Sequence, residues 1–443
     1  MDANVISPCP HAGICGGCAF GGTTYEESKA QKESRVKRLL APSFSLQMIE
    51  PEWADILCGP DIEGYRNKME FTFGDAEKDG PLELGLHRKG RFHDIVSVPD
   101  CRIVDADFRL ILSETLSFFS SFYDRKEITY YHRKRASGYL RHLLVRKARN
   151  TGDILVCLVT ATPGAETLGV PEEQLLRDFR DRLLSVKDRL SGSFCGILHT
   201  VNDAKSDAII DQGTGILFGK DSFEETLLGL RFKISPFSFF QTNSGGAAVL
   251  YETVRTYVTG ALASEGPGKK AHTVYDLYCG TGTIAQILSP VAEHVTGVEL
   301  VEEAVLSAKK AAAENGITNC TFLCGDVLKV LDSLAERPDV LVLDPPRSGL
   351  NPKTLPKLLS YGASHIVYVS CKPESLARDL PFFLTHGYAV TRGVCVDQFP
   401  WTEHVETVCL LGRRKPDDTI KVSVNMDDYY QIRDAEEAEK TPS

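Results

Sequence analysis

The stretch Thr273-Val-Tyr-Asp-Leu-Tyr-Cys-Gly-Thr-Gly-Thr-Ile284 decides the fold expected for this chain. It starts as an apolar run that suits a buried strand, turns at Gly280 and Gly282, and continues as a helix. Glycine has no Cβ, so the backbone at such a turn can approach a ligand closely. From Gln241 onward, helices and strands alternate, which is typical of a doubly wound parallel sheet. The sequence therefore predicts an α/β domain that binds its ligand at the carboxyl ends of the strands.

Acidic residues end the strands that follow this turn. Glu299 ends His294-Val-Thr-Gly-Val-Glu299, where a carboxylate can accept hydrogen bonds from both hydroxyls of a ribose; a helix cap or a solvated acid is the alternative. Asp326 ends a third strand and suits an adenine contact, and Asp344 ends a fourth apolar run. A dinucleotide site would need a third glycine, where this chain has Ala285. The series resembles the class I methyltransferases that use S-adenosylmethionine.

Composition indicates a large chain of more than one domain. With 443 residues, two or three domains are expected. No apolar stretch is long enough to span a membrane, and no signal pattern precedes the first residues, so we expect a cytoplasmic protein. The net charge of -10 is uneven, because the segment from Pro416 holds eight acidic residues against three basic ones. The expected divisions are a cysteine-rich N-terminal region (1–105), a central α+β domain (106–235), the α/β domain of the glycine turn (236–415) and a disordered acidic tail (416–443).

Three closely spaced cysteines indicate a metal centre near the N-terminus. They lie in Cys9-Pro-His-Ala-Gly-Ile-Cys-Gly-Gly-Cys18, and the middle one is Cys15. Zinc and iron–sulfur sites both accept four cysteines. Cys101 is the first candidate for the fourth ligand because it follows a strand and lies in a turn, and Cys58 is the second. Unconnected surface thiols are the alternative.

A thiol and a carboxylate indicate covalent catalysis. Cys371 ends the apolar run His365-Ile-Val-Tyr-Val-Ser-Cys371, and Glu406 ends Phe399-Pro-Trp-Thr-Glu-His-Val-Glu406. Carbon 5 of a pyrimidine is a poor nucleophile until a thiolate adds to carbon 6, and the hydrogen on carbon 5 must then leave to a base. Asp344-Pro-Pro is followed by Arg347 and not by the aromatic residue of amino-group methyltransferases. The pattern therefore favours methylation at carbon.

Four motifs resemble those of the RNA uracil-5-methyltransferases, the RumA/TrmA family: Phe240-Gln-Thr-Asn243, Asp344-Pro-Pro-Arg-Ser-Gly-Leu350, Val369-Ser-Cys-Lys-Pro-Glu-Ser-Leu-Ala-Arg-Asp379 and Val396-Asp-Gln-Phe-Pro-Trp-Thr-Glu-His-Val-Glu406. The similarity covers about residues 9–412 and is greatest with the iron–sulfur members that act on 23S rRNA. The resemblance implies an enzyme in which Cys371 is the nucleophile and Glu406 the base. It further implies that S-adenosylmethionine is bound by Gln241, Tyr278, Glu299 and Asp344, and a [4Fe–4S] cluster by Cys9, Cys15, Cys18 and Cys101.

The chain departs from the family pattern in two places. It begins almost at the cysteine cluster, so we expect no TRAM domain, the small RNA-binding barrel of many relatives. RNA must then be held by the cluster region and by a central basic segment, in which Tyr130, Tyr131 and Tyr139 interleave with residues 132–135 and Arg141. A solvated charged hairpin is the alternative for that segment. Trp401 stands where Gln, His or Tyr is usual, either stacking near the base or packing.

The expected activity is formation of 5-methyluridine in RNA by a monomeric enzyme. The Cys-rich N-terminal segment favours 23S rRNA over tRNA, which remains the alternative substrate. Methylation of cytosine carbon 5 in RNA is disfavoured, because those enzymes place a cysteine directly after Asp-Pro-Pro, where this chain has Arg347. An RNA-binding factor that has lost catalysis is disfavoured by the presence of Asp344, Cys371 and Glu406.

Overall fold

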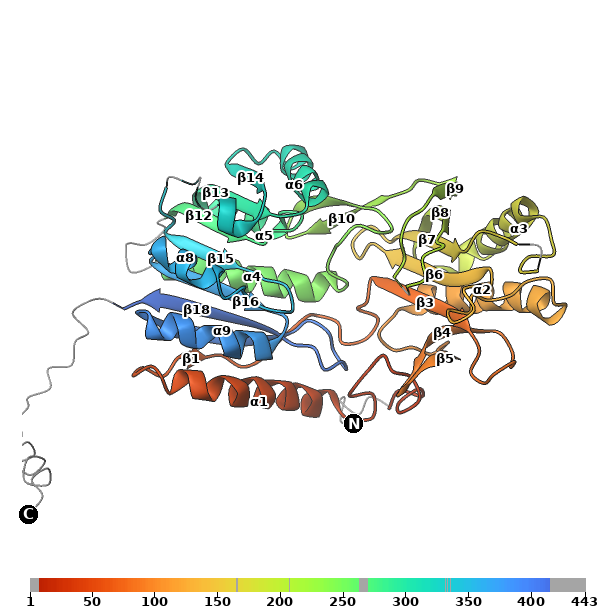
Figure 1. Cartoon of the computed structure of the whole chain (residues 1–443), viewed down its shortest axis with the longest axis horizontal. Helices are drawn as coiled ribbons and strands as arrows, with labels where there is room; N and C mark the ends of the chain where they lie inside the picture. The colour runs from red at the N-terminus through yellow and green to blue at the C-terminus, as the bar shows by residue number, and fades with distance from the viewer. Residues whose placement is uncertain are drawn as a thin grey trace, which may run out of the picture.

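The structure is a computed structural model, and it describes residues 8–164, 166–206, 208–262, 270–330, 332, 334 and 336–414. These residues form two lobes, each built around one large β-sheet (Figure 1). The acidic tail expected from residue 416 lies outside the described residues. Within the described part, no helix is both long and apolar enough to cross a membrane.

The first lobe contains the predicted doubly wound sheet. Its central strands run parallel in the order β16-β15-β12-β13-β14, and β18 and β17 continue the sheet in antiparallel pairing beyond β16. The chain order reverses between β12 and β15, which is where open α/β sheets bind ligands. The strands of this sheet are β1 (Glu52–Trp53), β2 (Leu57–Cys58), β12 (Ala271–Leu277), β13 (Ala292–Glu299), β14 (Cys320–Cys324), β15 (Val340–Leu343), β16 (His365–Ser370), β17 (Tyr388–Asp397) and β18 (Glu406–Arg413).

Helices cover both faces of this sheet, which explains why central strands such as β15 are apolar along their whole length. The helices on one face are α4 (Ser244–Ala261), α5 (Thr283–Leu288) and α6 (Glu302–Glu314). Those on the other face are α1 (Tyr25–Phe44), α7 (Val327–Val330), α8 (Thr354–Ser360) and α9 (Pro373–Thr385). The N-terminal helix α1 begins with a capping box made by Thr24 and Glu27, and it lies along α9 (Figure 1). An N-terminal segment is therefore part of the first lobe.

The second lobe is a seven-stranded sheet in the order β5-β4-β3-β6-β7-β8-β9, with α2 (Ala106–Asp124) and α3 (Glu172–Ser185) packed on it. All neighbouring strands are antiparallel except β7 and β8, which α3 connects. Because β3 pairs with β6, the sheet crosses the boundary expected at residue 105, and the four expected divisions stay a prediction. The strands are β3 (Lys68–Gly74), β4 (Glu83–Arg88), β5 (Arg91–Ser97), β6 (Leu140–Lys147), β7 (Asp153–Thr160), β8 (Ser193–Val201) and β9 (Thr214–Gly219).

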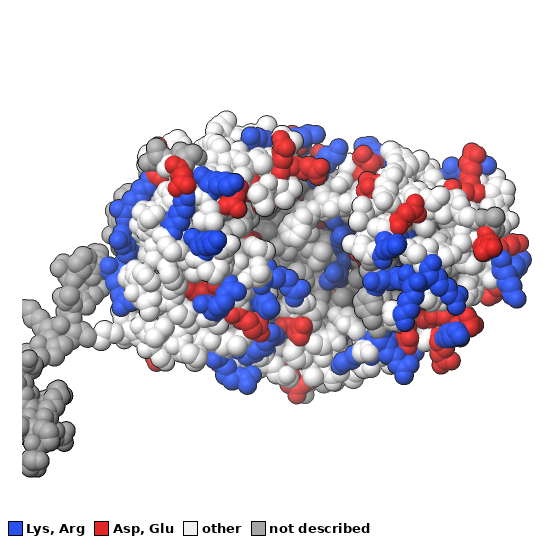
Figure 2. All heavy atoms as spheres, in the orientation of Figure 1, with Lys and Arg blue, Asp and Glu red and all other residues white. Residues whose placement is uncertain are grey.

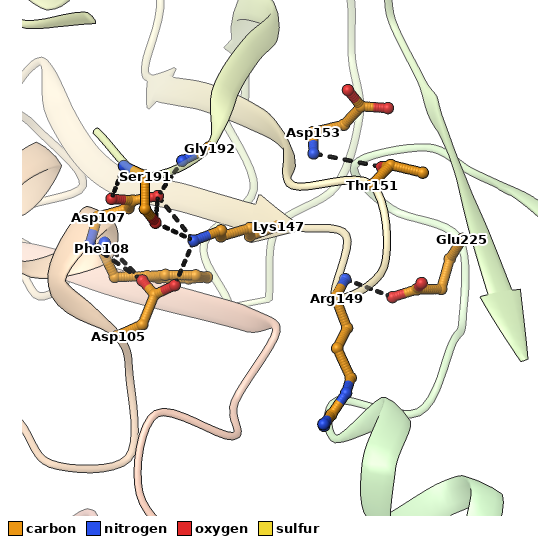
Figure 3. A network of polar contacts seen from close by, with 10 residues as sticks. All are labelled: Asp105, Asp107, Phe108, Lys147, Arg149, Thr151, Asp153, Ser191, Gly192 and Glu225. Carbon is orange, nitrogen blue, oxygen red and sulfur yellow. Dashed lines mark hydrogen bonds and ion pairs between the residues drawn. The ribbon is translucent and has the colours of Figure 1, made fainter. Parts of the chain in front are cut away.

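A lysine joins three segments at the end of β6 (Figure 3). The ammonium of Lys147 donates to the carboxylates of Asp105 and Asp107, which open α2. Asp107 also accepts hydrogen bonds from the backbone N–H groups of Ser191 (2.8 Å) and Gly192 (2.8 Å), just before β8. Asp107 is buried, so these donors compensate its desolvation. The network fixes α2 against the sheet.

A buried glutamate links the lobes. Glu225 lies in β10 (Phe223–Leu227), which pairs with β11 (Leu230–Ile234) between the two large sheets. Its carboxylate accepts from the backbone N–H of Arg149 in the second lobe at 2.7 Å (Figure 3). It also accepts from the hydroxyl of Ser244, the first residue of α4 in the first lobe, at 2.9 Å. One carboxylate therefore binds the end of a hairpin in one lobe to the start of a helix in the other.

Candidate active site

The turn after β12 has the shape expected of a ligand-binding glycine turn. Tyr278, Gly280 and Gly282 adopt φ angles of 67°, 53° and 72°. A Cβ on Gly282 would lie 2.5 Å from a ring carbon of Phe322 and 2.8 Å from Ala308. Glycine is therefore required at 282 both by the left-handed backbone and by the close packing of the turn on β14 and α6.

Glu299 lies beside this turn at the end of β13. Its carboxylate accepts hydrogen bonds from the backbone N–H of Gly280 at 3.0 Å and of Val301 at 3.0 Å. Asp326, at the end of β14, is exposed and accepts from the backbone N–H of Leu328 at 2.8 Å. Both acids therefore stand at the carboxyl edge of the parallel sheet, where the sequence predicted them.

Asp276 is a residue of this site that the sequence analysis missed. It is fully buried in β12 and accepts a hydrogen bond from the backbone N–H of Ala285 at 2.9 Å, which ties the strand to α5. Burial, with the charges of Asp344 and Glu299, raises its pKa well above the usual range. The available signal was an aspartate between Tyr275 and Leu277, near the end of a strand.

Gln241 connects the expected donor site to the loop before Glu406. Its side-chain oxygen accepts from the amide of Gln398 at 2.7 Å, and Gln398 follows β17 directly. Asn243 caps α4 through the backbone N–H of Gly246 and donates to the backbone carbonyl of Gln398 at 2.7 Å. The segment 241–243 and the loop after β17 are therefore held together by two hydrogen bonds.

Cys371 and Glu406 lie at neighbouring ends of paired strands. Cys371 directly follows β16, Glu406 opens β18, and Ser370 pairs with Thr407 across the two strands. Cys371 lines a pocket of about 240 Å³, formed mainly by polar and charged residues. Its other lining residues are Arg35, Arg347, Lys372, Pro373, Glu374, Glu403, His404 and Val405. Two separate sequence motifs, 365–374 and 399–406, thus contribute to one pocket.

Burial raises the pKa of Cys371, Glu406 and Asp344. The pKa of Cys371 rises to about 11 through burial and the nearby carboxylates of Glu406 and Asp344, against the opposing charge of Arg347. Burial and Asp344 raise the pKa of Glu406 to about 8, and Arg347 again opposes the shift. Burial alone raises the pKa of Asp344 to about 7. Near neutral pH the site therefore holds protons that a base must remove before the thiol can attack.

Trp401 packs inside the protein, which decides between the two roles that its sequence position allowed. Its side chain is 0% exposed, and its Nε1–H donates to the backbone carbonyl of Ile62 at 2.7 Å. The guanidinium of Arg102 lies over the indole, 4.3 Å from the ring centre. The ring therefore belongs to the core beside the cysteine region.

Four cysteines from two segments line one small cavity. They are Cys9, Cys15, Cys18 and Cys101, the expected cluster ligands. Cys58 lies elsewhere, in β2, which pairs with β17. Burial and the neighbouring cysteines raise the pKa of Cys18 to about 12. Four thiols are the ligand type that zinc and iron–sulfur centres accept. Among the described residues, however, no group of three or more His, Cys, Asp or Glu is arranged to hold a metal ion.

The central basic segment is divided between core and surface. Tyr139 is buried and donates its hydroxyl to Glu172, so it is not available to an RNA base. Arg141 is buried too, and it donates to the backbone carbonyls of Asn202, Ala204 and Ser206. Both residues stabilise the sheet, and the part of Tyr139 in the expected RNA contact was wrong because burial was not visible in the sequence. Arg141 also lies over the ring of Tyr131 and lines the groove described next, so its part stays a prediction.

The remaining basic residues line a groove on the second lobe. Arg133, Lys134 and Arg135 are exposed at a loop tip, next to the half-buried rings of Tyr130 and Tyr131. Together with strands β3 to β5, they line a cavity of about 280 Å³, here called the basic groove. Figure 2 shows Lys and Arg side chains gathered on this lobe over β3. The groove shares no lining residue with the pocket of Cys371.

In a comparison with known protein families, two family models match parts of the first lobe. The model of the tRNA (Uracil-5-)-methyltransferase family matches residues 328–414, which include Asp344, Cys371 and Glu406. A general methyltransferase-domain model matches residues 274–361, which include the glycine turn and Glu299.

Relatives match nearly the whole chain. A protein of Caldanaerobacter subterraneus subsp. tengcongensis, named as an uncharacterized RNA methyltransferase, is 46% identical over 92% of this chain and 85% of the relative. A protein of Clostridium tetani with the same designation is 42% identical over 93% of this chain and 84% of the relative. Among solved structures, the tRNA (uracil-54, C5)-methyltransferase of Pyrococcus abyssi, in complex with S-adenosyl-L-homocysteine, is similar with a TM-score of 0.67 and 26% identity. That match covers 90% of this chain and 86% of the other.

Proposed function

The chain belongs to the RNA uracil-5-methyltransferase family, and from that premise we propose that it methylates carbon 5 of one uridine in 23S rRNA, using Cys371 and Glu406. The enzyme is an RNA methyltransferase of the uracil-5 type that depends on S-adenosylmethionine. The observation that supports the proposed roles is the placement of the Cys371 thiol and the Glu406 carboxylate at adjacent ends of β16 and β18.

Cys371 is the proposed nucleophile. After losing its proton, its sulfur adds to carbon 6 of the uracil, and the electron pair of the ring double bond moves toward carbon 5. Arg347 lines the same pocket and its charge lowers the pKa of this thiol against the rise caused by burial, so it favours the thiolate. The base must be turned out of the RNA to reach this pocket.

Glu406 is the proposed base for the second half of the reaction. S-Adenosylmethionine supplies the methyl group that carbon 5 takes. The Glu406 carboxylate then removes the proton from carbon 5, the ring double bond forms again, and the bond between carbon 6 and the sulfur of Cys371 breaks. Burial and Asp344 raise the pKa of Glu406 to about 8, so its ionised form, which acts as the base, becomes more abundant as the pH rises above neutral.

Four residues are proposed to bind S-adenosylmethionine at the carboxyl edge of the sheet. Glu299 suits the ribose hydroxyls, because its carboxylate stands beside the glycine turn. Gln241, Tyr278 and Asp344 are proposed to complete the site. Asp276 is buried and supports the turn by its hydrogen bond to the backbone N–H of Ala285.

The test of this proposal uses RNA that contains 5-fluorouridine. Fluorine cannot leave carbon 5 as a proton does, so the wild-type protein should form a stable covalent adduct, seen as a shifted band on a denaturing gel. Cys371→Ala should form none. Glu406→Gln should form the adduct with normal uridine RNA and release it at least about 100-fold more slowly than wild type. An adduct that persists in Cys371→Ala would overturn the nucleophile assignment.

The choice of 23S rRNA is supported by the cysteine-rich N-terminal segment, which resembles that of the rRNA enzymes of the family. The tRNA alternative is supported by the similarity to the Pyrococcus abyssi tRNA enzyme. Mass spectrometry of 5-methyluridine in 23S rRNA and tRNA, from cells with and without the gene, separates the two. Loss of the nucleoside from tRNA alone would exclude the rRNA proposal.

We further propose that Cys9, Cys15, Cys18 and Cys101 hold a [4Fe–4S] cluster. Four thiols around one cavity support this, and the cluster would bind the N-terminal segment to the second lobe through Cys101. Anaerobically purified protein should contain about four iron and four sulfide per chain, with absorption near 400 nm that Cys101→Ser abolishes. Zinc without sulfide would contradict the cluster.

The proposed cellular setting follows from the substrate. An enzyme that modifies RNA with S-adenosylmethionine is proposed to act in the cytoplasm, as a monomer. Cell fractionation and light scattering of the purified protein test the two statements, and a membrane-associated or dimeric protein would contradict them.

A further inference from the structure

The loop between β17 and β18, residues 398–405, is held by segments that lie far from it in sequence. Four of its consecutive backbone carbonyls accept a hydrogen bond from another part of the chain. The pairs are Asn243 to Gln398 (2.7 Å), Lys32 to Phe399 (3.0 Å), Tyr65 to Pro400 (2.8 Å) and the backbone N–H of Phe20 to Trp401 (2.9 Å). The loop also has hydrogen bonds of its own, from Thr402 to the carbonyl of Phe399 and from the backbone N–H of His404 to Thr402. Its shape therefore depends on its surroundings as well as on this local turn.

Trp401 lies at the centre of this loop in a conformation that its surroundings must impose. Its φ angle is 68°, a left-handed value that is unfavourable for a bulky residue. The hydrogen bond from Nε1 to Ile62, the guanidinium of Arg102 and the ring of Tyr25, 5.5 Å away, enclose the indole. Strained backbone of this kind persists where packing fixes it, often at functional sites.

The residues that enclose Trp401 are neighbours of the cysteine cavity. Phe20, whose N–H holds the carbonyl of Trp401, is two residues from Cys18. Arg102, which stacks on the indole, directly follows Cys101 and lines the cavity itself. The segments 18–20 and 101–102 thus supply cysteines to the cavity and also contacts that support the loop.

The opposite end of the loop leads directly to Glu406. The carboxylate belongs to the first residue of β18, next to the pocket of Cys371. Proton transfer depends on placement within hydrogen-bond reach, and a shift of about 1 Å can cost about 100-fold in rate. A change in the position of Trp401 therefore reaches the proposed base through only four intervening residues.

We infer that Trp401 is a positioning residue, which aligns Glu406 for proton removal and makes that alignment depend on the packing of the segments around Cys18 and Cys101. The inference rests on the proposed function of Glu406. Because its side chain is 0% exposed, Trp401 acts through the backbone of the loop. It acts on the step in which the carbon 5 proton passes to Glu406 and the sulfur of Cys371 leaves carbon 6.

The first test compares two steps of one turnover in the full-length protein. RNA tritiated at carbon 5 of uridine reports methyl transfer and tritium release separately. Trp401→Phe should slow tritium release at least about 10-fold more than methyl transfer, so that a methylated covalent adduct accumulates on denaturing gels. Tyr65→Phe, which removes only the hydrogen bond to Pro400, should give the same adduct to a smaller extent.

The matched control is Tyr388→Phe. Tyr388 is also buried and donates one hydrogen bond, to the carbonyl of Ala363 at 2.6 Å, but it lies at the other end of β17. It should slow both steps equally or neither. Equal slowing of the two steps in both Trp401→Phe and Tyr65→Phe, without an adduct, would show that Trp401 only stabilises the fold and would overturn the inference.

The second test follows Trp401 directly. The chain has two tryptophans, so Trp53→Phe leaves Trp401 as the only one. In this background, Cys18→Ser should shift its fluorescence emission to longer wavelength, because the indole becomes more exposed. An unchanged emission would refute the dependence on the cysteine region. This readout needs no activity, whereas failure of the wild type to trap 5-fluorouridine RNA would refute the proposed function itself.

Discussion

The carboxyl group of Glu406 is buried and is affected by the negative charge of Asp344. Burial raises the pKa of Glu406 to about 8, whereas an unfolded glutamate titrates near about 4.3. Between these two pH values the unfolded chain has lost the proton and the folded chain has kept it. The folded state then binds more protons than the unfolded one, so stability falls as pH rises from about 4 to about 8. Above about pH 8 the carboxyl group is ionised in the folded chain as well, so its titration lowers the stability no further.

Glu406→Gln should therefore stabilise the protein at alkaline pH, because glutamine carries no charge to bury. We expect its Tm to exceed that of wild type by about 2–6 °C at pH 8.5, and the difference to shrink toward pH 5. Thermal unfolding measured by circular dichroism across this range tests it. Glu403→Gln, at an exposed position nearby, is the control and should show no such trend. A pH-independent difference for Glu406→Gln would contradict the buried carboxyl.

At the scale of the element, the turn between β12 and α5 distinguishes two glycines that look alike in sequence. Gly280 and Gly282 both have a positive φ, but a Cβ at Gly280 meets no atom within 4 Å, whereas at Gly282 it overlaps Phe322. Alanine at 280 adds backbone strain alone, and alanine at 282 adds strain and a clash with β14 and α6.

Gly282→Ala should therefore cost more stability than Gly280→Ala, by about 1–3 kcal/mol in the free energy of unfolding. Urea unfolding of the two variants and wild type gives the comparison. Because the turn carries the proposed donor site, we also expect weaker binding of S-adenosylhomocysteine by Gly282→Ala in calorimetry. Equal stability of the two alanine variants would mean that the turn relaxes away from Phe322.

At the scale of the whole molecule, the basic groove and the pocket of Cys371 lie on different lobes that Glu225 holds together. An RNA that fills both would contact the protein at two places. Because the chain has an overall charge of -10, such local contacts must outweigh the repulsion between the protein and the phosphates. Lys and Arg at such a groove neutralise phosphates, and each contact releases counterions and adds to the salt dependence of binding.

Lys134→Glu should therefore weaken RNA binding and lower the slope of log K against log salt by about 1, with little change in kcat. Lys187→Glu makes the same charge change at an exposed position of the same lobe outside the groove, and it should leave the slope unchanged. Fluorescence anisotropy of labelled RNA at several salt concentrations measures both. Equal effects of the two variants would indicate a general charge effect and exclude a groove contact.

The sequence by itself determined the features that depend on neighbouring residues. The glycine turn, the acid that ends each parallel strand and the thiol at the end of β16 are local patterns, and the regular geometry of a parallel sheet brings strand ends to one edge. This is why the class of fold, the family and the methyl donor could be inferred before any contact was known. Asp276 was missed because an acid within a buried strand has no such positional rule.

Only the tertiary structure decided the roles that depend on contacts between distant segments. It separated Cys101, which lines the cysteine cavity, from Cys58, which lies beside β17. It showed that Tyr139 and Arg141 belong to the core and that Trp401 packs against Arg102, 299 positions earlier in the chain. Burial and packing are properties of the assembled lobes. The same side chain can lie in the core or on the surface, depending on which residues pack against it in the folded protein.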